Sequence, residues 1–218
     1  MRNVYLDYSA TTPVKDEVLQ EMIPYFTEKF GNPSSLYDKG LESKDAISVA
    51  REQVASLINA KPAEIFFTAG GTESDNWAVF GVADKLREKG NHIITTKIEH
   101  HAMLHSCEFL EKSGFEVTYL DIDETGRINI DELVAAIKPE TILISIMMVN
   151  NEIGTIQDIK KISELVHKYN GVIHCDAVQA FMHTYLDVQE LGLDLMRVSG
   201  HKIGVPRGIG FLYKRKDL

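Results

Sequence analysis

The stretch Val172-Ile173-His174-Cys175-Asp176 decides the fold, together with Leu195-Met196-Arg197-Val198-Ser199, which forms the next such run along the chain. Both are short, mainly apolar runs of the kind that forms a buried β-strand. Similar runs recur at residues 64–68, 92–96, 116–120, 141–147 and 209–213. The sequence therefore predicts seven strands.

The segments between the first six strands have the length and pattern of helices. They cover residues 72–89, 100–113, 130–137 and 158–169, with a further short segment after Ala177. Strands that alternate with helices are typical of a parallel sheet. Only Val205-Pro206-Arg207-Gly208 joins the last two strands, so we expect the last strand to run antiparallel. We predict a three-layer α/β/α fold around a mainly parallel sheet, preceded by helices at residues 15–29 and 38–57.

Composition narrows the classes of function. The chain has 218 residues, of which 44% are hydrophobic and 25% charged, and its net charge is −9. These values predict one large globular domain and argue against a nucleic-acid or membrane surface. No window approaches 18 uninterrupted apolar residues. Two cysteines are too few for a disulfide framework, which favours a cytoplasmic protein that acts on small molecules.

Chemically active side chains follow the two strands quoted first. Asp176 ends one of them, and Ser199, His201 and Lys202 lie at the end of the next. Ligands of open parallel sheets bind beyond the carboxyl ends of the strands. A carboxylate for a ring nitrogen, hydroxyl and imidazole donors for a phosphate, and an amine for an aldehyde are what pyridoxal phosphate requires. These residues therefore predict a pyridoxal-phosphate site.

Other strand ends supply compatible groups. The turn Gly70-Gly71-Thr72 opens a helix, whose free N–H groups and positive end suit a phosphate. His100 follows the second strand and could stack on an aromatic cofactor and move protons. Either Asn150 or Asn151 could reach a ring oxygen or a substrate carboxylate, and Gln179 lies within reach of a ring hydroxyl.

Each of these residues has a simpler interpretation when it is taken alone. Thr72 could cap a helix, and so could Asp176. Lys202 could be a solvated loop lysine. The combination at successive strand ends favours the cofactor site over these separate interpretations.

His101 and His105 offer a rival metal site, because they are four residues apart on a predicted helix and Glu99 is close in sequence. A zinc site requires a further ligand and usually a recognisable histidine or cysteine pattern, which is absent here. We therefore expect no metal.

The sequence resembles the NifS/IscS-type cysteine desulfurases, which belong to the class-V aminotransferase branch of the fold-type-I pyridoxal-phosphate enzymes. The motifs that carry the resemblance occur in the family's order along the whole chain. They are Tyr5-Leu6-Asp7-Tyr8-Ser9-Ala10-Thr11-Thr12-Pro13, Gly31-Asn32-Pro33-Ser34-Ser35, Thr72-Glu73-Ser74-Asp75-Asn76, Glu99-His100, Val149-Asn150-Asn151-Glu152-Ile153-Gly154-Thr155, Asp176-Ala177-Val178-Gln179 and Ser199-Gly200-His201-Lys202.

The resemblance implies a role for each matching position. Lys202 is expected to carry the Schiff base and abstract the substrate proton, and His100 to stack on the ring and assist proton transfer. Asp176 would pair with the pyridine nitrogen and Gln179 with the ring oxygen. The remaining positions would hold the phosphate or, in the case of the asparagine, orient substrate and cofactor; they are Gly71, Thr72, Ser199, His201 and Asn151.

The resemblance also implies a reaction and a domain plan. The family removes sulfur from L-cysteine, giving L-alanine and a persulfide that passes to an iron–sulfur scaffold or another acceptor protein, and its members are homodimers. They run to roughly twice the length of a typical domain and end in a small C-terminal domain. We therefore expect residues 1–14 to be an arm that joins the small domain, residues 15–218 to be an incomplete large domain, and the small domain to be absent.

The cysteines bear on activity. The sulfur-accepting cysteine of the family lies in the part that this chain is expected to lack, and Cys107 and Cys175 are interpreted as small core residues. We expect the chain alone to lack desulfurase activity. A non-catalytic truncated scaffold, or the large domain of a selenocysteine lyase or class-V aminotransferase, is the alternative.

Overall fold

A computed structural model describes residues 2–218 and contains a seven-stranded sheet. The strands are β1 (Ile65–Thr68), β2 (His92–Thr96), β3 (Glu116–Leu120), β4 (Thr141–Ser145), β5 (Val172–Asp176), β6 (Leu195–Ser199) and β7 (Gly210–Lys214). Their spatial order is β1-β7-β6-β5-β4-β2-β3. β7 runs antiparallel to both of its neighbours, and all other pairs are parallel. The predicted strands and the antiparallel last strand are thus confirmed.

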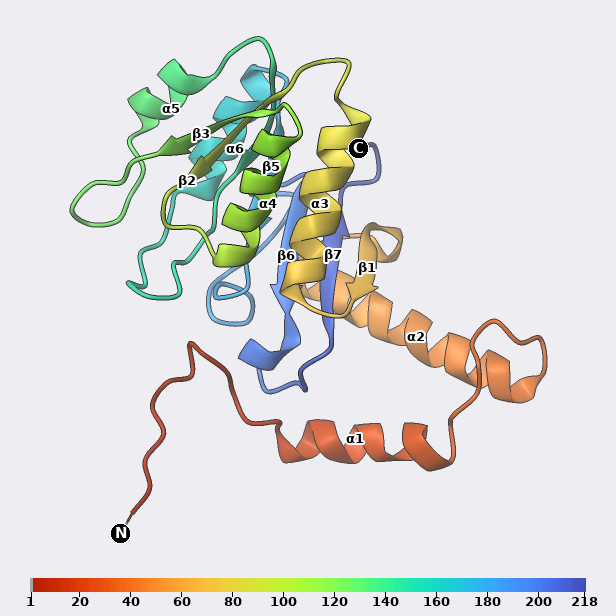
Figure 1. Cartoon of the computed structure of the whole chain (residues 1–218). Coiled ribbons are helices and arrows are strands. Elements are labelled where there is room, and N and C mark those ends of the chain that lie inside the picture. Colours follow the sequence, from red (N-terminus) through yellow and green to blue (C-terminus); the bar gives the residue numbers. More distant parts are fainter. Residues whose placement is uncertain (1) are drawn as a thin grey trace.

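Helices cover both faces of the sheet (Figure 1). The helices that pack on the sheet are α2 (Asp38–Leu57), α3 (Gly71–Lys85), α4 (His101–Lys112), α5 (Ile130–Ala136) and α6 (Ile159–Lys168). A further helix, α1 (Asp16–Thr27), lies apart from both faces (Figure 1). Successive side chains of a strand point to opposite faces. Ile93 accordingly packs with α3 and α4, whereas Ile94 packs with α2, α5 and α6. The three-layer α/β/α prediction is confirmed.

The predicted short helix after Ala177 is wrong, because the chain forms turns there. The amides of Ala180 and Phe181 both donate to the carbonyl oxygen of Ala177, at 3.0 and 2.8 Å. Met182 then adopts a left-handed conformation with φ of 65°. A left-handed residue stops a right-handed helix from propagating, so the segment ends as successive turns.

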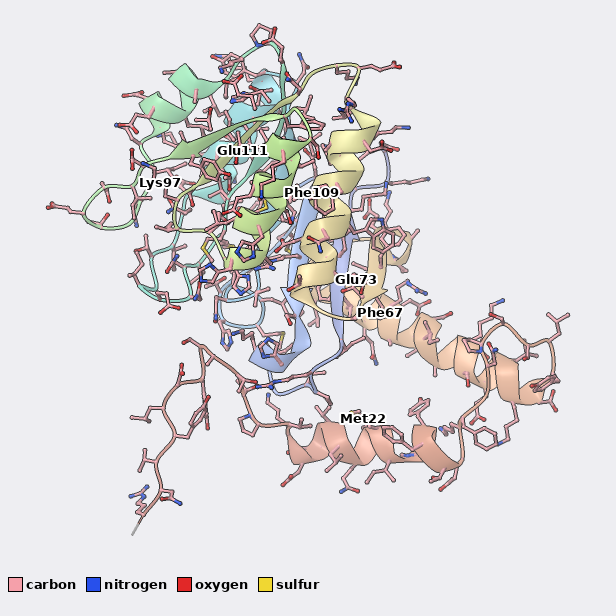
Figure 2. The ribbon with its side chains drawn as sticks, in the orientation of Figure 1. Met22, Phe67, Glu73, Lys97, Phe109 and Glu111 are labelled. Carbon is pink, nitrogen blue, oxygen red and sulfur yellow. The ribbon has the colours of Figure 1, made fainter. Side chains whose placement is uncertain are left out.

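The N-terminal part of the chain lies beside the carboxyl end of the sheet (Figure 1). No residue of α1 is buried, and one side of this helix lines a shallow hollow together with α2. Figure 2 shows the side chains of both helices. The segment before α1 is anchored, since the amide of Thr12 donates to the carbonyl oxygen of His201 at 2.9 Å. This contact brings residues 9–12 against the short helix η2 (Gly200–Lys202). Within residues 2–218, no helix combines the length and apolar character that crossing a bilayer requires.

Candidate active site

One cavity at the carboxyl ends of the strands collects the residues that the sequence singled out. Its volume is about 360 Å³, within the range of small-molecule sites. All of the predicted site residues line it: Gly71, Thr72, His100, Asn151, Asp176, Gln179, Ser199, His201 and Lys202. They come from five connections between strand and helix or strand and strand. The topology therefore assembles the predicted set in one place, as the rule for parallel sheets requires.

The floor of the cavity at α3 is made by glycine. Gly70 precedes the helix with φ of 148°, a conformation that residues with a side chain rarely adopt. Gly71 is the first helical residue, so Thr72 lies inside the helix and the simpler interpretation of Thr72 as its cap does not hold. Glu73 accepts a hydrogen bond from the amide of Ala69. The first amides of a helix have no partner within it, and they carry the positive end of the helix dipole. This end of the 15-residue helix α3 suits an anion.

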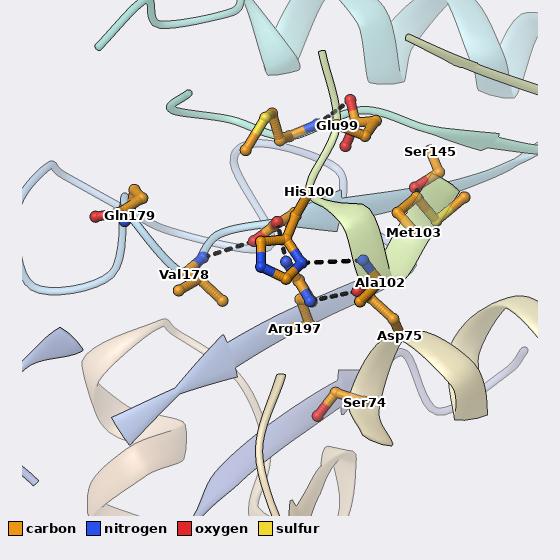
Figure 3. A network of polar contacts seen from close by, with 12 residues as sticks. Ser74, Asp75, Glu99, His100, Ala102, Met103, Ser145, Val178, Gln179 and Arg197 are labelled. Carbon is orange, nitrogen blue, oxygen red and sulfur yellow. Dashed lines mark hydrogen bonds and ion pairs between the residues drawn. The ribbon is translucent and has the colours of Figure 1, made fainter. Parts of the chain in front are cut away.

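His100 caps the helix α4 with its ring. Its Nδ1 accepts a hydrogen bond from the amide of Ala102 at 3.1 Å, so the neutral ring carries its proton on Nε2 (Figure 3). Desolvation and the nearby guanidinium of Arg197 lower the pKa of His100 below its ordinary value. The ring is therefore neutral near pH 7 and keeps one N–H available for donation.

Lys202 points at the N-terminal segment of the chain. Its Nζ donates hydrogen bonds to the carbonyl oxygens of Ser9 and, at 2.9 Å, of Ala10. Gln179 donates to the same carbonyl of Ser9 at 3.0 Å. Partial burial lowers the pKa of Lys202 from its ordinary value, which increases the fraction of neutral, nucleophilic amine.

His201 lies next to Lys202 and contacts the same N-terminal segment. Its Nδ1 is 3.1 Å from the hydroxyl oxygen of Thr11. Burial, followed by the charge of Lys202, lowers the pKa of His201. A neutral imidazole and a hydroxyl group therefore lie side by side at this edge of the cavity.

Asp176 is a buried carboxylate with both oxygens engaged. Oδ1 accepts from the amide of Val178 at 2.9 Å, and Oδ2 forms an ion pair with Nη2 of Arg197. Burial alone would raise the pKa of Asp176, but the guanidinium and the amide hold it below its ordinary value. Asp176 thus presents a fixed negative charge at the cavity wall.

Sequence reasoning did not single out Arg197 and Asp75. Arg197 lines the cavity, and its Nη1 forms an ion pair with the buried Asp75 of α3 (Figure 3). A signal was present, because an arginine inside an apolar strand must find a buried partner to offset its desolvation. Arg197 lies two residues before Ser199, so the two side chains point to the same face of β6.

The two asparagines after β4 have different surroundings. Asn150 is buried, donates to the carbonyl oxygen of Ile98 at 2.9 Å, and accepts from the amides of Glu152 and Ile153. Asn151 lines the cavity and donates to the carboxylate of Glu152 at 2.7 Å. Asn150 is therefore the residue that shapes the turn, and Asn151 is the one available to a ligand.

The rival arrangement for a metal is not assembled. The rings of His101 and His105 stack with centroids 6.0 Å apart. Glu99 lies elsewhere, because its carboxylate accepts from the Thr96 hydroxyl at 2.8 Å and the Met147 amide at 3.0 Å. Among residues 2–218 no group of three histidine, cysteine or acidic side chains is placed to hold a metal ion.

Comparison with known proteins identifies relatives along the whole chain. The family model described as "Aminotransferase class-V" matches residues 4–218. The chain is 55% identical over 212 residues to a cysteine desulfurase IscS of Clostridium botulinum, covering 97% of this chain and 53% of that protein. It is 56% identical over 215 residues to a cysteine desulfurase IscS of Methanosarcina thermophila, covering 99% and 53%. The chain thus spans about half the length of the curated relatives it matches.

Solved structures give the same result. A NifS-like protein superposes with a TM-score of 0.97 at 40% identity, covering all of this chain and 60% of that one. The structure described as SspA in complex with cysteine superposes with a TM-score of 0.95 at 42% identity, covering 97% and 61%. The chain is therefore similar to known proteins both in sequence and in fold.

Proposed function

The chain belongs to the class-V aminotransferase family, and on that premise we propose that it forms the pyridoxal-phosphate-binding part of a cysteine desulfurase. The observation that carries the proposal is the common cavity, in which an amine, an imidazole, an ionised carboxylate and a helix N-terminus meet. In the cytoplasm the parent protein would act on L-cysteine as a homodimer and pass the sulfur to an iron–sulfur scaffold or another acceptor.

The residues present fit the cofactor. The anion-binding start of α3 and the neighbouring Ser199 and His201 would hold the phosphate. A Cβ built on Gly71 would approach the Ser199 Cβ to 3.5 Å, so the glycine keeps this side of the cavity open. Asp176 would hold a proton on the ring nitrogen through a charged hydrogen bond. Gln179 and Asn151 would reach the ring oxygen and the substrate.

The chemistry divides between the cofactor and the chain. When bound, pyridoxal phosphate supplies an aldehyde that joins to amines and a ring that accepts electrons. Lys202 would hold the cofactor through Nζ and then use the same atom to take the proton from the substrate's α-carbon. His100, neutral and with its Nδ1 fixed by Ala102, would cover the ring and donate from Nε2.

The sulfur acceptor has to come from outside these residues. Cys107 and Cys175 have no exposed surface. Burial raises the pKa of both thiols, and a buried thiol is a poor nucleophile. We therefore propose that residues 1–218 bind and activate the substrate but do not themselves receive its sulfur.

The proposal is tested by adding pyridoxal phosphate to the purified chain. We expect a new visible absorbance band and, after borohydride reduction, a cofactor adduct that peptide mass spectrometry maps to Lys202. Lys202→Ala should lose both signals. Lys97→Ala is the control, because Lys97 forms an exposed ion pair with Asp121 away from the cavity. An adduct at another lysine, or no adduct in the unaltered chain, would contradict the proposal and favour a non-catalytic scaffold.

A further inference from the structure

A buried ion-pair network forms one wall of the cavity. The Arg197 side chain is 3% exposed, and its guanidinium bridges two carboxylates, Asp75 at 0% and Asp176 at 4% exposure. The partners lie on three different elements: α3, the end of β5, and β6. Burial raises the pKa of Asp75 well above its ordinary value, against the opposing charge of Arg197, whereas the pKa of Asp176 is lowered. One guanidinium thus lies between two carboxyl groups that titrate over different pH ranges.

The other titratable groups near this network carry little compensating charge. His174 lies on β5 with Nε2 3.8 Å from Asp75, but burial and Arg197 lower the pKa of His174 to about 3, so its ring is neutral. Glu99 follows β2, and burial raises the pKa of Glu99 to about 8, so it is mostly protonated near pH 7. Lys202 approaches from η2, but its Nζ donates hydrogen bonds to the carbonyl oxygens of Ser9 and Ala10 and not to the carboxylates of the network.

His100 approaches from the N-terminus of α4, and its pKa is also lowered, by desolvation and by Arg197. It is therefore neutral near pH 7 and adds no positive charge at the network. Arg197 is thus the cation that is hydrogen-bonded to the carboxylate of Asp176.

We propose that Arg197 is a positioning residue that keeps Asp176 ionised and fixed at the cavity wall, and that Asp75 holds Arg197 in place. Nη2 of Arg197 and the amide of Val178 engage different oxygens of Asp176, which fixes the plane of the carboxylate. Each oxygen retains a lone pair that a ligand can use. The inference rests on the proposed function in one respect: it takes a cofactor ring nitrogen as the group that Asp176 meets.

Arg197 and Asp75 act differently on Asp176. The guanidinium stabilises the ionised form of Asp176, which lowers its affinity for a proton. The guanidinium also offsets part of the negative charge of Asp176, and this charge would otherwise stabilise a protonated ring nitrogen. Because the pKa of Asp75 is raised and that of Asp176 is lowered, Asp75 is protonated over the pH range in which Asp176 titrates. There Asp75 holds Nη1 of Arg197 as a hydrogen-bond acceptor and does not compete for its charge. Removing Arg197 should therefore raise the titration midpoint of Asp176, whereas replacing Asp75 by asparagine should leave it nearly unchanged.

The first test uses the cofactor-free protein and follows the side-chain carboxyl carbon of Asp176 by carbon-13 NMR during a pH titration. The double variant Arg197→Met with Asp75→Asn removes the guanidinium and replaces Asp75 by a neutral amide, so it leaves no second buried carboxyl group without its partner. We expect its Asp176 midpoint to rise by at least about one pH unit, a tenfold gain in proton affinity. Asp75→Asn alone should leave the midpoint nearly unchanged, because its amide oxygen still accepts from Arg197 and Asp75 is protonated in this pH range.

Arg51→Met is the matched control for loss of an arginine. Arg51 lies on α2, where its Nε donates to the carbonyl oxygen of Ile65 at 3.1 Å, and it does not line the cavity. Its replacement should leave the Asp176 midpoint unchanged. Equal midpoints in the unaltered protein and the double variant would overturn the inference, and so would an equal shift in the Arg51 variant.

The second test follows the visible spectrum of the cofactor-loaded protein against pH. The ring nitrogen should titrate at higher pH in the double variant than in the unaltered protein, and Asp75→Asn alone should shift it less than the double variant does. Cofactor binding with an unchanged titration would overturn the inference and leave the proposed function in place. Failure of the unaltered protein to bind the cofactor would overturn the proposed function, and the NMR titration would still decide whether Arg197 controls Asp176.

Discussion

Gly71 lies so close to Arg197 that a Cβ built on the glycine would come within 3.2 Å of the guanidinium Nη1. The same atom would meet Cγ2 of Val178 at 3.5 Å. Arg197 cannot easily move away, because ion pairs to Asp75 and Asp176 hold it on two sides. At Gly71, the start of α3 and the strand β6 are thus packed more tightly than a side chain usually allows.

Gly71→Ala should therefore destabilise the protein by about 1–3 kcal/mol, the usual cost of overpacking a core. It should also weaken pyridoxal-phosphate binding, because the added methyl group narrows the cavity. Gly81→Ala on the same helix is the control: its Cβ would meet nothing within 4 Å. Higher helix propensity should make that variant more stable by about 0.5–1 kcal/mol. Urea unfolding measures both, and effects of the same sign would contradict the prediction.

Glu99 should make stability fall as the pH rises. Burial raises the pKa of Glu99 from 4.5 to about 8, so the folded protein keeps a proton that the unfolded chain releases within this window. The contribution of Glu99 is complete below pH 4.5 and is lost as the pH rises through about 8.

Glu99→Gln isolates this contribution, because it keeps an acceptor for the amide of Met147. Between these pH values the free energy of unfolding of the unaltered protein should fall relative to the variant by up to about 1.4 kcal/mol per pH unit. Urea unfolding at several pH values checks this. Parallel curves for the two proteins would show that Glu99 titrates alike in both states.

Cys107 and Cys175 should be inert in the folded protein. Burial raises the pKa of Cys107 to about 12 and that of Cys175 above its ordinary value, so neither thiol ionises near neutral pH. A thiol reagent should label both only after denaturation. With pyridoxal phosphate and L-cysteine added, mass spectrometry should find no persulfide on either residue. Labelling of the native protein, or a persulfide at one of them, would contradict our view that the acceptor lies elsewhere.

The strands were predictable because each is a short run rich in apolar and β-branched residues, and most of them are buried. The run at residues 172–176 coincides with β5, and that at residues 195–199 with β6. The segment after Ala177 was not predictable in the same way, since nothing local reveals that Met182 turns left-handed. Tertiary packing decides that conformation, and propensity does not report it.

The candidate site was predictable where its residues follow strands. Parallel topology brings such residues together, which is why Asp176 and Lys202 line one cavity. Arg197 and Asp75 were not predicted. The arginine in an apolar strand indicates that a buried partner exists, but local patterns do not show which residue it is, because Asp75 lies on a helix 122 residues away. The contact of Lys202 with Ala10, across 192 residues, is equally invisible to local patterns.

The pairing of β1 with β7 has a consequence for the newly made chain. β1 lies at the edge of the sheet, and its neighbour β7 is the strand of this sheet that comes latest along the chain. While residue 214 is still inside the ribosome, the chain can form the turn that opens α3, but this turn cannot yet pack against a completed sheet. Long-range pairing of this kind folds slowly. On the proposed function, we therefore expect cofactor binding to follow translation of this region.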